Sequence, residues 1–81
     1  MRPDVTIAYV LINCDLGAEE SIIEELKKLE QVQEVFETVG THDLMAKLES
    51  EHLEKLREVI TWNIQKIDKV RSTVTLVKKG S

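Results

Sequence analysis

The feature of this sequence that most constrains its fold is the way its hydrophobic period changes along the chain. Runs rich in β-branched residues, with the two-residue period of a strand, alternate with runs whose apolar residues recur every three or four positions. The order is strand, helix, strand, strand, helix, strand. Local periodicity therefore predicts a mixed α and β protein in which no segment is left as a long structureless linker.

Four strands are expected, at residues 5–13, 32–39, 43–49 and 70–77. The first is apolar on both faces, so something must cover each side of it. The break at residues 40–42 is short, and the second and third strands therefore form an antiparallel hairpin.

Two amphipathic helices are expected, at residues 18–30 and from Ser50 to near Lys66. Glutamates crowd the start of the first helix and lysines its end, an order that complements the helix dipole. Asp15 or Gly17 is expected to cap this helix and Ser50 the second. Right-handed crossovers turn this order into a four-stranded antiparallel sheet with both helices on one face. The sequence thus predicts the ferredoxin-like α+β fold, βαββαβ.

The length of 81 residues corresponds to one domain, residues 1–81, whose own core is marginal. Small domains gain stability from disulfides, metals or oligomerisation. The chain has one cysteine, Cys14, and few metal ligands, which leaves oligomerisation. The helix-free face of the sheet carries apolar residues of the first strand, so we expect a homodimer formed through this open face.

Composition excludes several classes of partner. A net charge of −4 and an aromatic content of 4% argue against direct binding of nucleic acid. The longest apolar run, residues 7–12, is too short to span a membrane, and no signal peptide precedes it. These features predict a cytoplasmic protein. The prevalence of Glu and Lys over Asn and Gln is typical of thermophilic proteins.

The adjacent pair His42 and Asp43 is the first candidate for chemistry. Neighbouring residues of an extended segment point to opposite faces, so Asp43 would orient His42 poorly as a catalytic base. A polar hairpin turn is the simplest interpretation. The alternative is a loop that binds a small ligand. In it, Gly40 lets the backbone come close to the ligand, backbone N–H groups bind a carboxylate, and Asp43 binds an ammonium group.

Other candidates are weaker. Cys14, His42 and His52 have no metal-ligand spacing, so neither a metal nor another cofactor is expected. Cys14 is interpreted as a small packed residue, and Trp62 as part of the core or of an interface. The run Arg71-Ser72-Thr73-Val74-Thr75 fits ordinary strand propensity, or else supplies hydroxyls to a small ligand.

The chain resembles the effector-binding (RAM) domain of the Lrp/AsnC family, the leucine-responsive or feast/famine regulators. The resemblance rests on Ala8–Cys14, Val32–Glu37, Val39–Leu44 and Val70–Leu76, and most of all on the Gly-x-x-Asp hairpin combined with the Arg-Ser-Thr-x-Thr strand. It implies dimers with facing sheets that associate into rings of the octamer or decamer type. It also implies that free amino acids bind between dimers, at Gly40, Thr41, His42 and Asp43 of one and at Ser72, Thr73 and Thr75 of the adjoining one.

The helix-turn-helix that normally precedes this domain is not present in the sequence. We therefore expect a stand-alone domain, with no enzymatic activity or DNA binding of its own, that senses an amino acid and modulates transcription or amino-acid metabolism through assembly. Full-length paralogues are possible partners of that assembly. Two alternatives stay open: a small cofactor-free dimeric α+β barrel enzyme, of the monooxygenase or lyase type, using His42 and Trp62, and an ACT-like regulatory domain.

Overall fold

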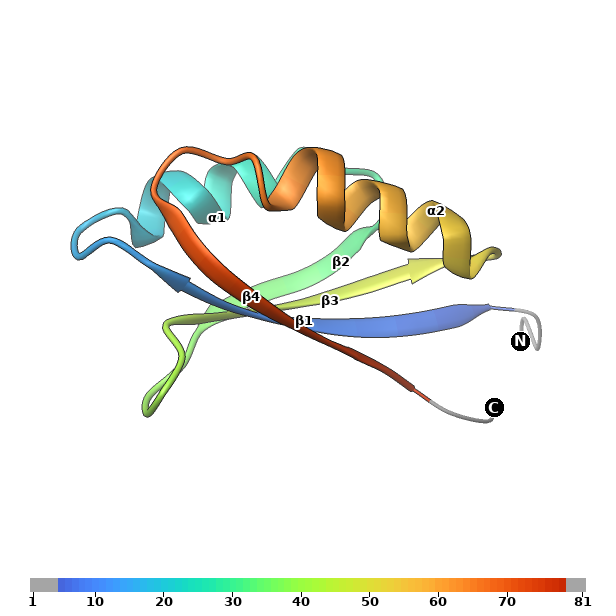
Figure 1. The fold of residues 1–81 in the computed structure, drawn as a ribbon, viewed down its shortest axis with the longest axis horizontal. Helices are drawn as coiled ribbons and strands as arrows, with labels where there is room; N and C mark the ends of the chain where they lie inside the picture. Colours follow the sequence, from blue (N-terminus) through green and yellow to red (C-terminus); the bar gives the residue numbers. More distant parts are fainter. Residues whose placement is uncertain (1–4, 79–81) are drawn as a thin grey trace.

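The computed structural model describes residues 5–78, and the remaining terminal residues lie outside that description. Seven elements follow one another along the chain (Figure 1): β1 (Thr6–Cys14), α1 (Glu19–Lys27), β2 (Val32–Glu37), β3 (Leu44–Ser50), α2 (Leu53–Glu58), the π-helix η1 (Val59–Ile64) and β4 (Val70–Val77). Because η1 continues α2 directly, the order is βαββαβ and confirms the ferredoxin-like fold.

The four strands form one antiparallel sheet in the order β2-β3-β1-β4. Strand β1 is central and pairs with β3 on one side and with β4 on the other. Both helices lie across the same face of the sheet (Figure 1). The expected hairpin of the second and third strands is confirmed by the pairing of β2 with β3.

Strand β1 shows why the sequence produces these two layers. Its Ala8, Val10 and Ile12 are buried, while the residues between them are half-buried. The buried set faces the helices and joins a core of fourteen buried side chains, which come from β1, α1, β3, α2 and η1 and from Ala18 just before α1. Burial of such side chains supplies the dominant favourable term in folding. No polar or charged residue among residues 5–78 is buried with them.

The opposite side of the sheet is here called the open face. Strand register places Tyr9 between Lys47 and Leu76, and Leu11 between Met45 and Val74, on this side. Val74 and Leu76 are 47% and 53% exposed. The apolar residues of the open face are Ile7, Tyr9, Leu11, Phe36, Met45, Val74 and Leu76. No part of the described chain covers them, which is the condition under which a partner is expected.

Several element ends differ from the sequence-based expectation. Helix α1 ends at Lys27, three residues early. Ala18, rather than Asp15 or Gly17, is the N-cap residue and makes no side-chain cap, and its N–H donates to the backbone carbonyl of Asp15 (3.1 Å). Strand β2 ends at Glu37, and Val39 is fully exposed in the following loop rather than packed in a strand.

The expected cap at Ser50 is also wrong. Ser50 is the last residue of β3, and its Oγ accepts a hydrogen bond from the N–H of His52 (3.3 Å), just before the helix begins. His52 occupies the N-cap position of α2 and makes no side-chain cap. None of the helices within residues 5–78 is long and apolar enough to cross a membrane.

The π-helical turn explains the position of Trp62. The N–H of Gln65 bonds to the carbonyl of Ile60 (2.8 Å), five residues back, which widens the helix. Val59, Ile60 and Ile64 are buried by this arrangement, whereas Trp62 is 69% exposed. Trp62 is therefore not a core residue of this chain, and the other half of its interpretation, an interface position, stays a prediction.

Candidate ligand-binding site

The loop between β2 and β3 is tied to the end of the central strand. The N–H of Asp43 donates to the carbonyl of Ile12 (2.9 Å), and the N–H of Thr38 donates to the carbonyl of Asp43 (2.9 Å). Thr38 Oγ1 also donates to the carbonyl of His42 (2.6 Å). These bonds fix the base of the loop, so a ligand held there would be held against β1.

The side chain of Asp43 has a structural contact that the sequence did not reveal. Its Oδ2 accepts the N–H of Cys14 (2.9 Å), where β1 changes register. A charged acceptor makes this bond stronger than a neutral one would. One carboxylate oxygen of Asp43 is therefore occupied within the chain, and the other accepts no hydrogen bond from residues 5–78.

His42 has no contact with Asp43 that would orient it. Its Nδ1 lies 3.1 Å from Thr41 Oγ1, at an exposed position. The catalytic dyad therefore has no geometric support. In four grooves of residues 5–78, Trp62 lines one and His42 lines none, so none of these four joins the two residues that the barrel-enzyme alternative requires.

Gly40 gives the loop its shape. Its φ of +119° lies in a region that residues with a Cβ rarely adopt, although a Cβ built there would meet nothing within 4 Å. Conformation, rather than crowding, therefore demands glycine. The space around it is open, and backbone groups of the loop tip are accessible to a small molecule.

The predicted hydroxyl strip of β4 is divided between two faces. Ser72 lies opposite Asn13 on the open face, whereas Thr73 and Thr75 lie opposite Ile12 and Val10 on the helix side. Thr73 Oγ1 accepts a hydrogen bond from Gln65 Nε2 (3.1 Å). Ser72 and Thr73 border one groove of about 300 Å³, lined also by Gln65, Val70 and Arg71, while Thr75 borders another.

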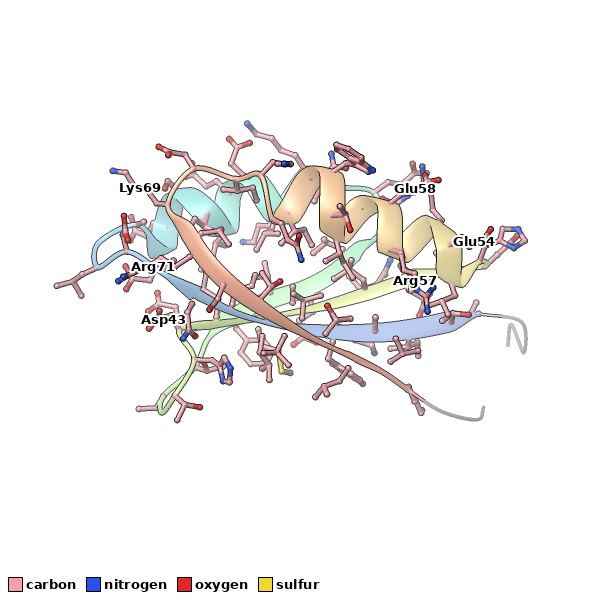
Figure 2. The ribbon with its side chains drawn as sticks, in the orientation of Figure 1. Asp43, Glu54, Arg57, Glu58, Lys69 and Arg71 are labelled. Carbon is pink, nitrogen blue, oxygen red and sulfur yellow. The ribbon has the colours of Figure 1, made fainter. Side chains whose placement is uncertain are left out.

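Within one subunit the two groups of predicted residues do not share a groove. The loop bearing Asp43 extends from β3, and β1 separates β3 from β4. Neighbouring strands are about 4.8 Å apart, so roughly 10 Å separates β3 from β4. Both groups nevertheless lie at the same end of the sheet, where Asp43 and Arg71 appear together in Figure 2.

Asn13 is a candidate that the sequence reasoning missed. It lies on β1 between the loop and Ser72, and its Oδ1 is buried without a hydrogen-bond partner in the described part of the chain. A buried acceptor of this kind is costly unless a donor reaches it. The sequence did contain a signal for Asn13. It is a polar residue at the next open-face position of β1 after the apolar residues Ile7, Tyr9 and Leu11.

Burial and the negative charges at this end of the sheet change the pKa of Cys14. The thiol is buried, and burial, followed by the negative charge of Asp43, raises its pKa. Cys14 is thus a packed, protonated thiol, as the sequence indicated. Asp15 Oδ1 and Arg71 Nε form an exposed ion pair of 3.7 Å nearby. Residues 5–78 hold no group of three side chains that could bind a metal ion.

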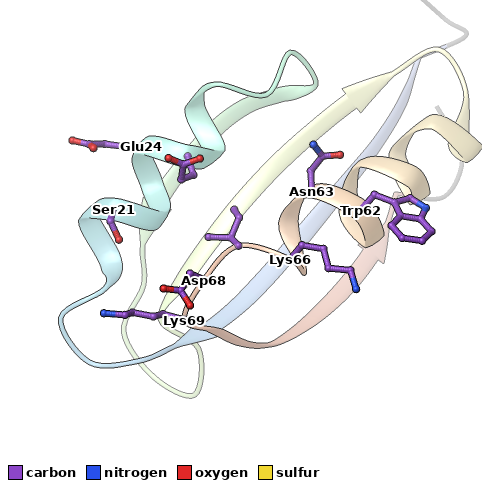
Figure 3. Close-up of a pocket in the computed structure, with 9 residues that line it drawn as sticks. Ser21, Glu24, Trp62, Asn63, Lys66, Asp68 and Lys69 are labelled. Carbon is purple, nitrogen blue, oxygen red and sulfur yellow. The ribbon is translucent and has the colours of Figure 1, made fainter.

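A separate groove of about 590 Å³ lies between α1 and the C-terminal part of the second helix (Figure 3). Trp62 lines it, but the indole ring lies on the far side of the helix from α1, with Lys66 beside it. Lys66 Nζ is 5.7 Å from the ring centroid, an intramolecular cation–π contact. Glu24 on α1 and Lys66 on the second helix point away from each other in Figure 3, so these two charges do not converge on one ligand position.

Comparison with known proteins gives a consistent result. The family model described as "Lrp/AsnC ligand binding domain" matches residues 7–78. An uncharacterized HTH-type transcriptional regulator of Pyrococcus abyssi is 30% identical over 71 residues, which are 88% of this chain and 45% of that protein. The regulatory protein AsnC of Haemophilus influenzae is 31% identical over 58 residues, 72% of this chain and 39% of that protein. The chain thus spans less than half the length of these relatives.

Solved structures agree. A protein from Thermus thermophilus superposes with a TM-score of 0.89 at 30% identity, over 94% of this chain and 95% of that one. A transcriptional regulator from Neisseria meningitidis, solved as a complex with L-methionine, superposes with a TM-score of 0.82 over 90% of this chain and 49% of that one. At 12% identity the second likeness establishes the shared fold alone.

Proposed function

Since the chain belongs to the Lrp/AsnC ligand-binding domain family, we propose that it is an amino-acid-sensing oligomerisation module whose assembly modulates transcription or amino-acid metabolism. Its named relatives are transcriptional regulators, so the regulatory setting comes with the family. The observation that supports an amino-acid ligand is the second carboxylate oxygen of Asp43 at one end of β1, which accepts no hydrogen bond from residues 5–78. A carboxylate oxygen suits the N–H donors of an ammonium group.

The loop of Gly40, Thr41, His42 and Asp43 would hold the ligand's backbone groups. The open tip exposes N–H groups that suit a carboxylate, and Asp43 at the base suits the ammonium. The regulator solved with L-methionine indicates that this fold accommodates such a ligand. Ser72, Thr73 and Thr75 would come from a neighbouring dimer, because their own subunit separates them from Asp43 by a strand.

Two kinds of contact are therefore proposed. The open face, with its exposed Val74 and Leu76, would form a homodimer of facing sheets. Dimers would then join through the loop and β4 into a ring of the octamer or decamer type, with the ligand between them. A ligand bound at such an interface stabilises the assembled state by mass action.

The chain would act in the cytoplasm and without contacting DNA itself. Its net charge of −4 disfavours a phosphate backbone. Its effect on transcription would pass through mixed assembly with full-length paralogues of the family.

A thermal-shift screen against the common amino acids, with particle mass followed by light scattering, tests the proposal. A ligand at a hundred times its Kd stabilises by about 2.7 kcal/mol, which raises the Tm of a domain this small by about 10 °C or more. We expect a selective shift that Asp43→Asn reduces. Asparagine is preferred to alanine, because its Oδ1 can still accept the N–H of Cys14. Asp15→Asn is the matched control at the same end of the sheet.

Two results would count against the proposal. No amino acid shifting the Tm of an intact oligomer would leave only a structural role. Equal loss of response in the Asp43 and Asp15 variants would mean that general charge, rather than the loop, carries the response.

A further inference from the structure

The groove that Thr75 borders, remote from the loop of Gly40–Asp43, has the shape and chemistry of a small-ligand site. It lies between the second helix and the helix-side face of the edge strand β4, and its volume is about 370 Å³. That volume falls within the range of small-molecule pockets. It is lined by Ala8, Leu53, Leu56, Arg57, Ile60, Thr61, Gln65, Thr75 and Val77.

The floor of the groove is apolar. Ala8, Leu56 and Ile60 lie beneath it and are at most 5% exposed, so its accessible apolar surface comes from the walls, Leu53 and Val77. Floor and walls of this kind favour an aliphatic group of a few carbons, since each methylene buried there contributes to binding.

The rim carries one charge. Arg57 extends from α2 towards the sheet, whereas Glu54 and Glu58 of the same helix lie on other sides of it (Figure 2). Within residues 5–78 Arg57 forms neither an ion pair nor a side-chain hydrogen bond. A guanidinium matches a carboxylate through two parallel hydrogen bonds, so a free one beside an apolar floor selects an aliphatic acid.

The remaining polar groups are neutral. Thr61 and Thr75 bring hydroxyls, and Gln65 brings an amide whose Nε2 already donates to Thr73. Neither aspartate nor glutamate lines this groove, in contrast to the loop, where Asp43 supplies a carboxylate. An ammonium group would thus have no counter-charge here, while a carbonyl oxygen would find donors.

We propose that this groove binds a short branched-chain carboxylate without an ammonium group, of the 2-oxo-acid class. Its carboxylate pairs with Arg57, its 2-oxo group accepts hydrogen bonds from the rim, and its alkyl chain lies against Leu53 and Val77. The groove shares Thr75 with the amino-acid site proposed above, but it lies away from the loop of Gly40–Asp43 that would hold the amino acid's backbone groups. The protein would then respond separately to an amino acid and to its deaminated counterpart.

Calorimetric titration of the intact oligomer with 4-methyl-2-oxopentanoate tests this. We expect binding that Arg57→Gln weakens about tenfold, the loss of one charge-assisted contact at an exposed rim. Arg71→Gln is the matched control, an exposed arginine outside the groove, and should bind as the wild type does. Thr61→Tyr, an exposed position at the mouth, should block the groove and abolish binding without disturbing the core.

Competition separates the two sites. Saturating leucine should not displace the oxo acid, and the oxo-acid titration stands whether or not leucine binds at all. Several results would overturn the proposal: no binding of the oxo acid, equal effects of the two arginine variants, or displacement by leucine at its own Kd. A change in oligomer mass caused by Thr61→Tyr would mean that a neighbouring subunit fills the groove, which would also overturn it.

Discussion

Truncation of Leu76 gives the sharpest test of how the open face is used. Leu76 is 53% exposed in the isolated chain, and full burial of a leucine contributes about 1.5–3 kcal/mol. Covering the exposed half should therefore contribute about 0.8–1.6 kcal/mol in each subunit. In a twofold dimer both subunits carry the substitution. Leu76→Ala should therefore weaken the dimer by up to about 1.5–3 kcal/mol, or roughly ten- to a hundredfold in Kd.

Sedimentation velocity over a dilution series measures this Kd directly. Leu16→Ala is the matched control, because Leu16 is 98% exposed in the turn between β1 and α1, away from the open face. The reasoning is refuted if both variants dissociate at the same concentration as the wild type. A wild-type chain that is monomeric at micromolar concentration would refute it equally.

Three further predictions concern stability and reactivity. Cys14 should react with iodoacetamide far more slowly than a free thiol at pH 8, as followed by mass spectrometry. Its raised pKa also means that stability is full below the unfolded thiol's pKa and falls as pH rises through the folded value, which denaturant titrations up to pH 10 would reveal. Lys69 has a φ of 75°, so Lys69→Val should lower the free energy of unfolding by about 1–2 kcal/mol while Lys69→Gly does not, and urea titration would measure both. Trp62→Ala should cost less than about 1 kcal/mol and Ile64→Ala about 2–5 kcal/mol in the same assay, and equal costs would contradict the exposure of the indole.

Much of the fold was predictable because its signal is local. The alternation of Ala8, Val10 and Ile12 with other apolar residues predicted a strand, and β1 forms there with this side covered by the helices; the cover of its other side stays a prediction. The element ends were less predictable. Ser50 has a side chain suited to capping, yet it is held in β3 by its pairing with Thr6. Pairing between strands outweighed the local capping preference there.

The candidate site was predictable only in part. The loop Gly40–Asp43 could be located from its residue types, but the bond from Asp43 to Cys14 joins residues 29 positions apart and has no local signature. The division of Ser72 from Thr73 and Thr75 could have been foreseen, because successive strand residues face opposite sides. The π-helical turn that exposes Trp62 could not, since its apolar spacing also fits an ordinary helix.

The outer strand β2 bears on how the protein behaves when concentrated. Within residues 5–78 it pairs on one side only, with β3, which leaves the backbone groups of its other edge without a strand partner there. Exposed edges of this kind are where sheets of different molecules can join into aggregates. Glu34 and Glu37 are both exposed on this strand, so two such edges brought together would oppose like charges. Replacing these glutamates by neutral residues would remove a safeguard against edge-to-edge aggregation while leaving the core intact.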